Sequence, residues 1–211
     1  MVARSVPLYR DVIDVTAHWA IRYYREGTAV YDIGCSTGTQ LDLIGRLSPH
    51  PVRLVGVDGS KSMLDRARAK LAEVAARHEV QLVHEDAVGS DYENASVAIL
   101  NYTLQFVPVV QRPILLEKLA NALCPGGILI LSEKVRSSRP DFQETITRLH
   151  EDFKARNGYT RTEIARKKEA LENVLVSLTL EQQLEQLERA GFAHAETILR
   201  WHNFVTVVAA R

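Results

Sequence analysis

The stretch Asp32-Ile33-Gly34-Cys35-Ser36-Thr37-Gly38 decides the fold, because it joins a strand-like run to a helical one. The run before it, Thr28 to Ile33, is short, apolar and rich in β-branched residues, which is typical of a buried strand. The segment Leu41 to Leu47 after it is expected to be a helix. Glycines at such a turn let backbone N–H groups approach a ligand closely. The stretch therefore predicts the first strand and loop of a Rossmann-like domain.

Strands and helices alternate along the chain on both sides of this turn. Such alternation predicts a mainly parallel sheet covered by helices on both faces. Two final strand-like runs, separated by His202-Asn203, predict an antiparallel hairpin, which is typical of class I methyltransferase folds. We therefore expect an α/β fold of this class with seven strands, and Pro125-Gly126-Gly127 turning into the fifth. The expected strands are 28–33, 53–57, 80–83, 96–100, 128–131, 195–201 and 204–209, and the expected helices are 9–24, 41–47, 60–77 (N-cap Ser60), 112–122 and 181–190.

The length and composition suit one domain spanning residues 1–211. A polar, charge-dense helical stretch at about 141–175 does not match the strand pattern, so we expect a lid-like insertion there. Lys plus Arg and Asp plus Glu both number 26, and no dense basic stripe occurs, which argues against direct nucleic-acid binding. No signal peptide or membrane-length apolar run is evident, so we expect a cytoplasmic protein. The cysteines and histidines lack metal-ligand spacing, and no metal is expected.

Polar residues follow each predicted parallel strand, where open α/β sheets bind ligands. Asp58 comes twenty residues after Gly38 and is placed to accept hydrogen bonds from ribose hydroxyls, while Asp86 and Asn101 follow the third and fourth strands. The pattern Gly-x-Ser-x-Gly differs from the dinucleotide fingerprint and lacks the Lys-Ser/Thr pair of a phosphate loop. An adenosine joined to an amino acid fits such a site better than NAD. We therefore expect S-adenosylmethionine (SAM) as the bound molecule.

The chain resembles the carboxy-S-adenosyl-L-methionine synthases, enzymes of the tRNA wobble-uridine modification pathway. The matching stretches run through almost the whole chain and include the predicted insertion. They are Arg4-Ser-Val-Pro-Leu-Tyr9, Tyr31-Asp-Ile-Gly-Cys-Ser36, Glu93-Asn-Ala-Ser96, Leu100-Asn-Tyr-Thr-Leu-Gln-Phe106, Leu131-Ser-Glu-Lys134, His150-Glu-Asp-Phe-Lys-Ala-Arg-Asn-Gly-Tyr159 and Leu171-Glu-Asn-Val174.

The resemblance implies which residues bind SAM. Lys168 stands where the family has an arginine that holds a new carboxylate, and lysine lacks the planar fork of arginine. Gly59 stands where the family tends to have asparagine. Asn101, Lys168 and Tyr9 are the implied catalytic residues. The implied SAM contacts are Tyr9 over the ligand, Gly34, Cys35 and Ser36 at the methionine end, Asp58 at the ribose, Asp86 and Ala87 at the adenine, and Asn101 near the sulfonium, with Gly38 and Gly59 in the same loops.

Three reactions remain open at this stage. The resemblance implies carboxylation of the SAM methyl group with prephenate as the carboxylate source, in a homodimeric enzyme. Attack of the SAM amino group on its own γ-carbon would give azetidine-2-carboxylate and methylthioadenosine, and would need no second substrate. Methyl transfer to a small acceptor is the third possibility. Tyr9, Tyr102 and Tyr159 are candidates for cation–π contact with the sulfonium, and Arg166, Lys167 and Lys168 for an anion site, although helix packing and solvated charge also explain these residues.

Overall fold

The computed structural model describes residues 2–172 and 174–211 and confirms the class I methyltransferase fold, with a seven-stranded sheet in the order β3-β2-β1-β4-β5-β7-β6. The first five strands pair in parallel, whereas β7 pairs antiparallel with both β5 and β6. The carboxyl ends of β1 and β4 therefore lie side by side at the point where the strand order reverses, where such sheets bind ligands. The strands are β1 Ala29–Ile33, β2 Arg53–Asp58, β3 Glu79–His84, β4 Ala95–Asn101, β5 Leu123–Lys134, β6 His194–Trp201 and β7 Phe204–Ala210.

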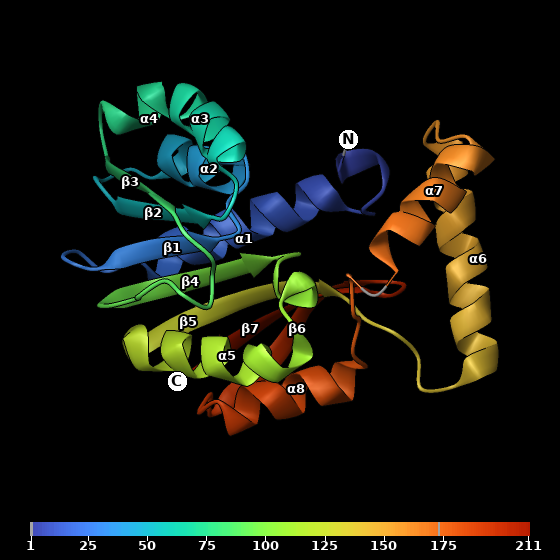
Figure 1. The fold of residues 1–211 in the computed structure, drawn as a ribbon. Helices are drawn as coiled ribbons and strands as arrows, with labels where there is room; N and C mark the ends of the chain where they lie inside the picture. The colour runs from blue at the N-terminus through green and yellow to red at the C-terminus, as the bar shows by residue number, and fades with distance from the viewer. Residues whose placement is uncertain (1, 173) are drawn as a thin grey trace.

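Helices cover both faces of this sheet (Figure 1). One face carries α1, α2, α3 and α4, and the other carries α5 and α8. Each face buries its own apolar cluster, centred on residues such as Val30 and Ile130 on the first and Leu100 and Leu116 on the second. The helices of the two layers are α1 Tyr9–Tyr23, α2 Thr39–Leu47, α3 Lys61–Lys70, α4 Ala72–Ala75, α5 Arg112–Ala122 and α8 Leu180–Arg189, with short 3₁₀ turns η1 Val2–Arg4, η2 Leu104–Phe106 and η3 Val109–Gln111.

Two helices stand apart from these layers, beyond the carboxyl ends of the parallel strands (Figure 1). They are α6 Pro140–Arg156 and α7 Arg161–Leu171, in the predicted insertion; residue 173 of that insertion lies outside the described residues. The N-terminal segment reaches this pair, because the Arg4 guanidinium donates to the carbonyls of Asn157 and Gly158 in the α6–α7 turn. His150 Nε2 of α6 also bonds to the Ser5 carbonyl at 2.8 Å. The insertion is therefore tied to the chain's N-terminus across the edge of the sheet.

The structure corrects two details of the sequence prediction. The helix predicted over 60–77 breaks at Leu71 into α3 and α4, and the Ser60 side chain makes no capping bond; its hydroxyl faces that of Ser62 at 3.1 Å. The Pro125-Gly126-Gly127 turn lies within β5 rather than before it. Leu123 pairs with Ala95 and Ile128 with Val97, so residues 124–127 form a bulge in a longer strand. The helical period alone did not reveal the break, because Leu71 and Val74 both face the core.

Within residues 2–172 and 174–211, no helix is both long and apolar enough to cross a membrane.

Candidate functional site

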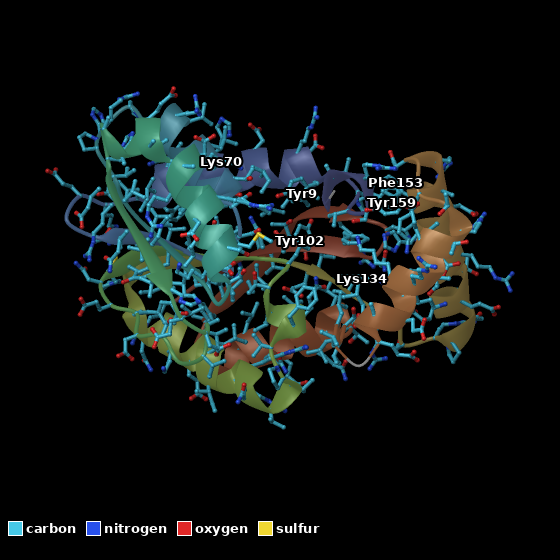
Figure 2. All side chains as sticks on the ribbon, turned by 45° about the horizontal axis from the view of Figure 1, so that its top comes forward. Tyr9, Lys70, Tyr102, Lys134, Phe153 and Tyr159 are labelled. Carbon is cyan, nitrogen blue, oxygen red and sulfur yellow. The ribbon has the colours of Figure 1, made fainter. Side chains whose placement is uncertain are left out.

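A cavity of about 780 Å³ lies between the strand ends and the α6–α7 pair. In Figure 2, Tyr9, Tyr102 and Lys134 lie at this opening, between the sheet and the insertion. A smaller hollow of about 220 Å³, which shares Gly34 with the cavity, extends over the ends of β2 and β3. Together they are large enough for a molecule of SAM size. The predicted site residues Tyr9, Gly34, Cys35, Ser36, Asn101 and Lys168 line the cavity, and Asp58, Gly59, Asp86 and Ala87 line the hollow.

The glycine turn is held tightly against its neighbours. Gly34 and Cys35 both donate their backbone N–H groups to the Val57 carbonyl, at 2.8 and 3.0 Å. Gly34 has a φ of +76°, and a Cβ atom there would stand 2.3 Å from the Thr103 hydroxyl oxygen, so only glycine fits. Gly38 also has a positive φ but is not among the described residues that line either cavity. A Cβ at Gly38 would stand 3.1 Å from Leu71 Cδ1, so the absence of a side chain here allows Leu71 to pack closely.

Asp58 braces this turn from the end of β2. Its Oδ2 accepts the backbone N–H of Ser36 at 2.8 Å, and its Oδ1 accepts that of Ser60, also at 2.8 Å. Each carboxylate oxygen has a second lone pair available for a ribose hydroxyl. The same side chain can therefore both shape the turn and bind the ligand.

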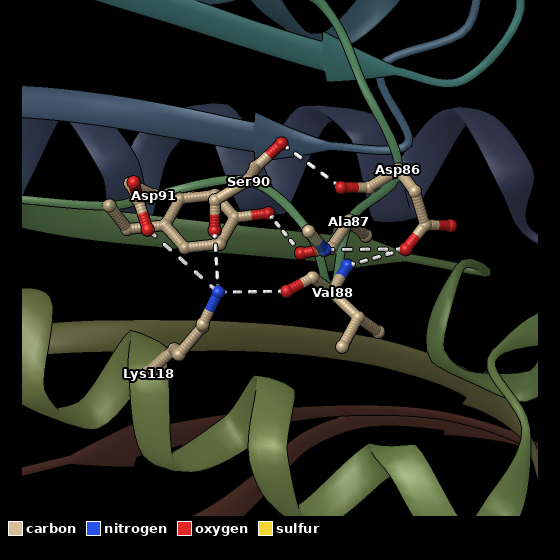
Figure 3. Close-up of polar contacts among 8 residues, drawn as sticks. Asp86, Ala87, Val88, Ser90, Asp91 and Lys118 are labelled. Atoms are coloured by element: carbon tan, nitrogen blue, oxygen red, sulfur yellow. Dashed lines mark hydrogen bonds and ion pairs between the residues drawn. The ribbon is translucent and has the colours of Figure 1, made fainter.

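The loop after β3 is ordered by contacts to α5 (Figure 3). Asp86 Oδ1 accepts the Val88 backbone N–H at 2.9 Å, and Lys118 Nζ donates to the carbonyls of Val88 and Ser90 at 2.8 and 3.1 Å. These bonds close the loop that carries Ala87 along the rim of the smaller hollow. Lys118 was not predicted from the sequence, because a lysine in an amphipathic helix does not indicate that it will bind the backbone of a loop.

Two tyrosines stand over the cavity. The rings of Tyr9 and Tyr102 lie 6.4 Å apart between centroids, and the Tyr102 hydroxyl is buried without a hydrogen-bond partner within the described part of the chain. Burial, and secondly Glu133, raises the pKa of this hydroxyl, which keeps it protonated. Tyr159, the third candidate, is not among the described lining residues. Its ring instead lies under the Arg4 guanidinium and the Lys167 ammonium, 4.9 and 5.3 Å from the centroid.

Asp32, at the end of β1, is a site residue that the sequence analysis missed. It lines the cavity although the residue is only 3% exposed. Burial, and secondly the Asp58 carboxylate, raises the pKa of Asp32 to about 7. A carboxyl group held in this way binds a cation readily, since a positive charge relieves both effects. Its position two residues before Gly34 was a signal, but the residue was counted as part of the strand.

Four lysines line the cavity: Lys134 at the end of β5, and Lys154, Lys167 and Lys168 on the insertion. Burial lowers the pKa of Lys134, as does repulsion from Lys168, and burial followed by repulsion from Lys134 lowers that of Lys154. Lys168 pairs with Glu151 at 3.4 Å. Two further lining carboxylates, Glu169 and Glu172, are exposed to solvent, as is Lys168. Lys134 and Lys154 were missed in the sequence because they come from β5 and α6, and only folding brings them to Lys168.

SAM matches this distribution of charge. The carboxyl of Asp32 and the rings of Tyr9 and Tyr102 suit its cationic centre, and Asp58 is placed for its ribose. The turn at Gly34 leaves room for close backbone approach to the ligand.

Comparison with known proteins also supports a SAM-binding site. Residues 30–127 match a family model described as a methyltransferase domain. The chain is 51% identical to a carboxy-S-adenosyl-L-methionine synthase of Trichodesmium erythraeum over 209 residues, covering 99% of this chain and 83% of that protein. It is 40% identical to the enzyme of that name from Nitratiruptor, covering 100% of this chain and 87% of the relative.

The structure also superposes on a SAM-bound magnesium protoporphyrin IX methyltransferase from Synechocystis with a TM-score of 0.64. That alignment covers 96% of this chain and 79% of the other at 16% identity, so it shows a common fold. The sequence identity to the synthases, which extends over nearly the full chain, shows the family as well as the fold. This chain is a SAM-dependent enzyme of the class I methyltransferase fold and belongs to the carboxy-S-adenosyl-L-methionine synthase family.

Proposed function

We propose that this enzyme carboxylates the methyl group of SAM and takes the carboxylate from prephenate. The observation that carries the proposal is that four lysines, one at the end of β5 and three on the insertion, line the same cavity as the acceptors for the SAM cation. Prephenate is a dicarboxylate, and the product carries one carboxylate more than SAM. Both need positive charge beside the methyl group, which Lys134, Lys154, Lys167 and Lys168 supply. Cyclisation of SAM involves no second, anionic substrate, so the carboxylate of SAM itself would be the one anion to bind.

In this reaction, the SAM methyl group loses one proton and gains carbon dioxide. Prephenate loses its ring carboxylate and its ring hydroxyl and becomes aromatic. The expelled hydroxide combines with the methyl proton to give water, so atoms and charge balance. We assign Lys168 to the new carboxylate and Asn101 to the sulfonium side, with Tyr9 covering the ligand. Gly34, Cys35 and Ser36 would hold the methionine part, and Asp58, Gly59, Asp86 and Ala87 the adenosine.

The test is to incubate the purified protein with SAM alone and with SAM plus prephenate, and to follow the products by mass spectrometry. We expect a species with the mass of SAM plus carbon dioxide only when prephenate is present. Methylthioadenosine with azetidine-2-carboxylate from SAM alone would instead establish the cyclase reaction. Absence of both products would refute the proposal and favour methyl transfer to another small acceptor.

We further propose that residues 1–211 act as one cytoplasmic domain with a lid at about 141–175, working as a homodimer. The bonds of Arg4 and His150 between the N-terminal segment and the insertion support the lid, because they hold α6 and α7 across the cavity. Light scattering after size exclusion would give twice the chain mass for a dimer.

A further inference from the structure

Two of the cavity lysines are bound within the protein and two are not. The Lys167 ammonium donates to the Ser5 hydroxyl at 3.2 Å, and Lys168 forms an ion pair with a glutamate of α6. The side chains of Lys134 and Lys154 have no hydrogen bond or ion pair to any of residues 2–172 and 174–211, although both residues are half-buried. Neither ammonium nitrogen is among the fully buried unpaired atoms, so each keeps surface that a ligand can contact. Lys134 and Lys154 therefore bring two unpaired ammonium groups to the wall of the cavity.

The groups packed around Lys134 and Lys154 compensate little of this charge. Burial lowers the pKa of each ammonium, and repulsion from a second lysine lowers it further. Glu151 opposes this shift in both, but its carboxylate is already paired with Lys168 at 3.4 Å, and the other lining carboxylates of the insertion are exposed to solvent. His150, on the same helix, is neutral because burial lowers its pKa to about 4. An anion bound here would relieve both the repulsion and the cost of burial.

We propose that Lys134 and Lys154 bind the carboxylate that the second substrate keeps while it gives its other carboxylate to SAM. This assignment rests on the proposed function, in which prephenate enters as a dicarboxylate and leaves as phenylpyruvate, with one carboxylate. Lys168 is assigned there to the transferred group. The two unpaired lysines remain for the retained one.

The chemistry of the transfer favours the same division of roles. The retained carboxylate is negatively charged in the substrate, the transition state and the product, so two ammonium groups can hold it without slowing the reaction. The transferred carboxylate must break its bond to the ring, and strong neutralisation of its charge beforehand would stabilise the substrate against that loss. Lys168, which shares its charge with Glu151, is suited to hold that group less tightly.

The experiment is calorimetric titration of phenylpyruvate into the SAM-saturated enzyme. We expect Lys134→Met and Lys154→Met each to weaken phenylpyruvate binding about tenfold, because each removes a charged partner of its carboxylate, whereas Lys168→Met should change it less than about twofold. Lys61→Met, on the exposed surface of α3, is the control for a general effect of charge. Native affinity for SAM would show that the variants are folded. Equal weakening in all three cavity variants, or none in Lys134→Met and Lys154→Met, would overturn the assignment.

The melting temperature of the ligand-free protein is a second readout. A half-buried ammonium without a partner costs free energy, so Lys134→Met and Lys154→Met should each melt at a higher temperature than the native protein. Lower melting temperatures in both would mean that the protein itself already neutralises these groups, which contradicts the proposal. Absence of carboxylated SAM in the product assay would refute the proposed function and this assignment together. Normal product formation with native phenylpyruvate affinity in both variants would refute this assignment alone.

Discussion

The Asp58 carboxylate accepts the backbone N–H of Ser36 at 2.8 Å, which ties the end of β2 to the glycine turn after β1. Asp58→Ala removes this brace together with the charged acceptor at the hollow. We expect the affinity for SAM to fall at least about tenfold, since bonds to a charged group are worth roughly 1.5–3 kcal/mol each. Asp65→Ala is the control, because Asp65 makes only surface ion pairs on α3. Calorimetric titration giving near-native affinity for Asp58→Ala would contradict the placement.

We expect Asp32 to make SAM binding depend on pH. Its pKa is raised to about 7, so below that pH the carboxyl is protonated and must release a proton to face a cation. Affinity should therefore fall roughly fivefold to tenfold between about pH 7.5 and pH 6. Asp32→Asn should abolish the part of this dependence that Asp32 causes, and any dependence that remains in the variant reports the ionisation of SAM itself.

The same substitution should change the stability of the ligand-free protein. Because the pKa of Asp32 is raised on folding, stability is lost as pH rises from the unfolded value through about 7. Asp32→Asn should thus melt at a higher temperature than the native protein at about pH 8, and not at about pH 4. If Asp32→Asn and the native protein melt at the same temperature at both pH values, burial does not raise the pKa of the Asp32 carboxyl.

Lys168→Met tests the anion site. We expect KM for prephenate to rise about tenfold or more while the affinity for SAM alone is unchanged, since Lys168 lies on the insertion side of the cavity. Lys168→Arg keeps the positive charge and should retain most turnover. Lys61→Met, on the exposed surface of α3, is the control. Turnover of Lys168→Met at native KM would remove this residue from the site.

Lys118→Met tests the loop after β3. Loss of the two bonds to Val88 and Ser90 should loosen the rim of the hollow and weaken SAM binding about threefold to tenfold. The neighbouring Glu117→Gln, which is exposed, should bind normally. If titration gives equal affinities for the two variants, the loop does not depend on Lys118.

Arg112→Met tests a buried charge in the core beside the site. Arg112 is 1% exposed, donates to the carbonyls of Val107, Gln105 and Val176, and lowers the raised pKa of the buried Glu133. Removing the guanidinium leaves three buried or part-buried carbonyls without this donor, and each unsatisfied group costs about 1–3 kcal/mol. Urea denaturation should show this loss. A cost below about 1 kcal/mol would indicate that the three carbonyls find other donors when Arg112 is removed.

Much of the architecture followed from local pattern. The strand 28–33, the helix 112–122 and the final hairpin were predicted within a residue or two, because buried strands and amphipathic helices carry their periods in the sequence. The break at Leu71 and the bulge at 124–127 were not predicted, since both depend on how neighbouring strands and helices pack.

The sequence by itself determined the glycine turn and the residues that follow each strand, because the parallel topology brings all strand ends to one edge. Only the tertiary structure decided the character of the cavity. Folding buries the carboxyl of Asp32. It also places Lys134 in the same cavity as Lys154 and Lys168, which lie far from it in the chain. The Asn101 amide likewise donates to Gln40 Oε1 at 3.0 Å, which joins the end of β4 to α2. Burial, electrostatic coupling and hydrogen-bond direction depend on the positions of groups in space. A local sequence pattern does not contain those positions.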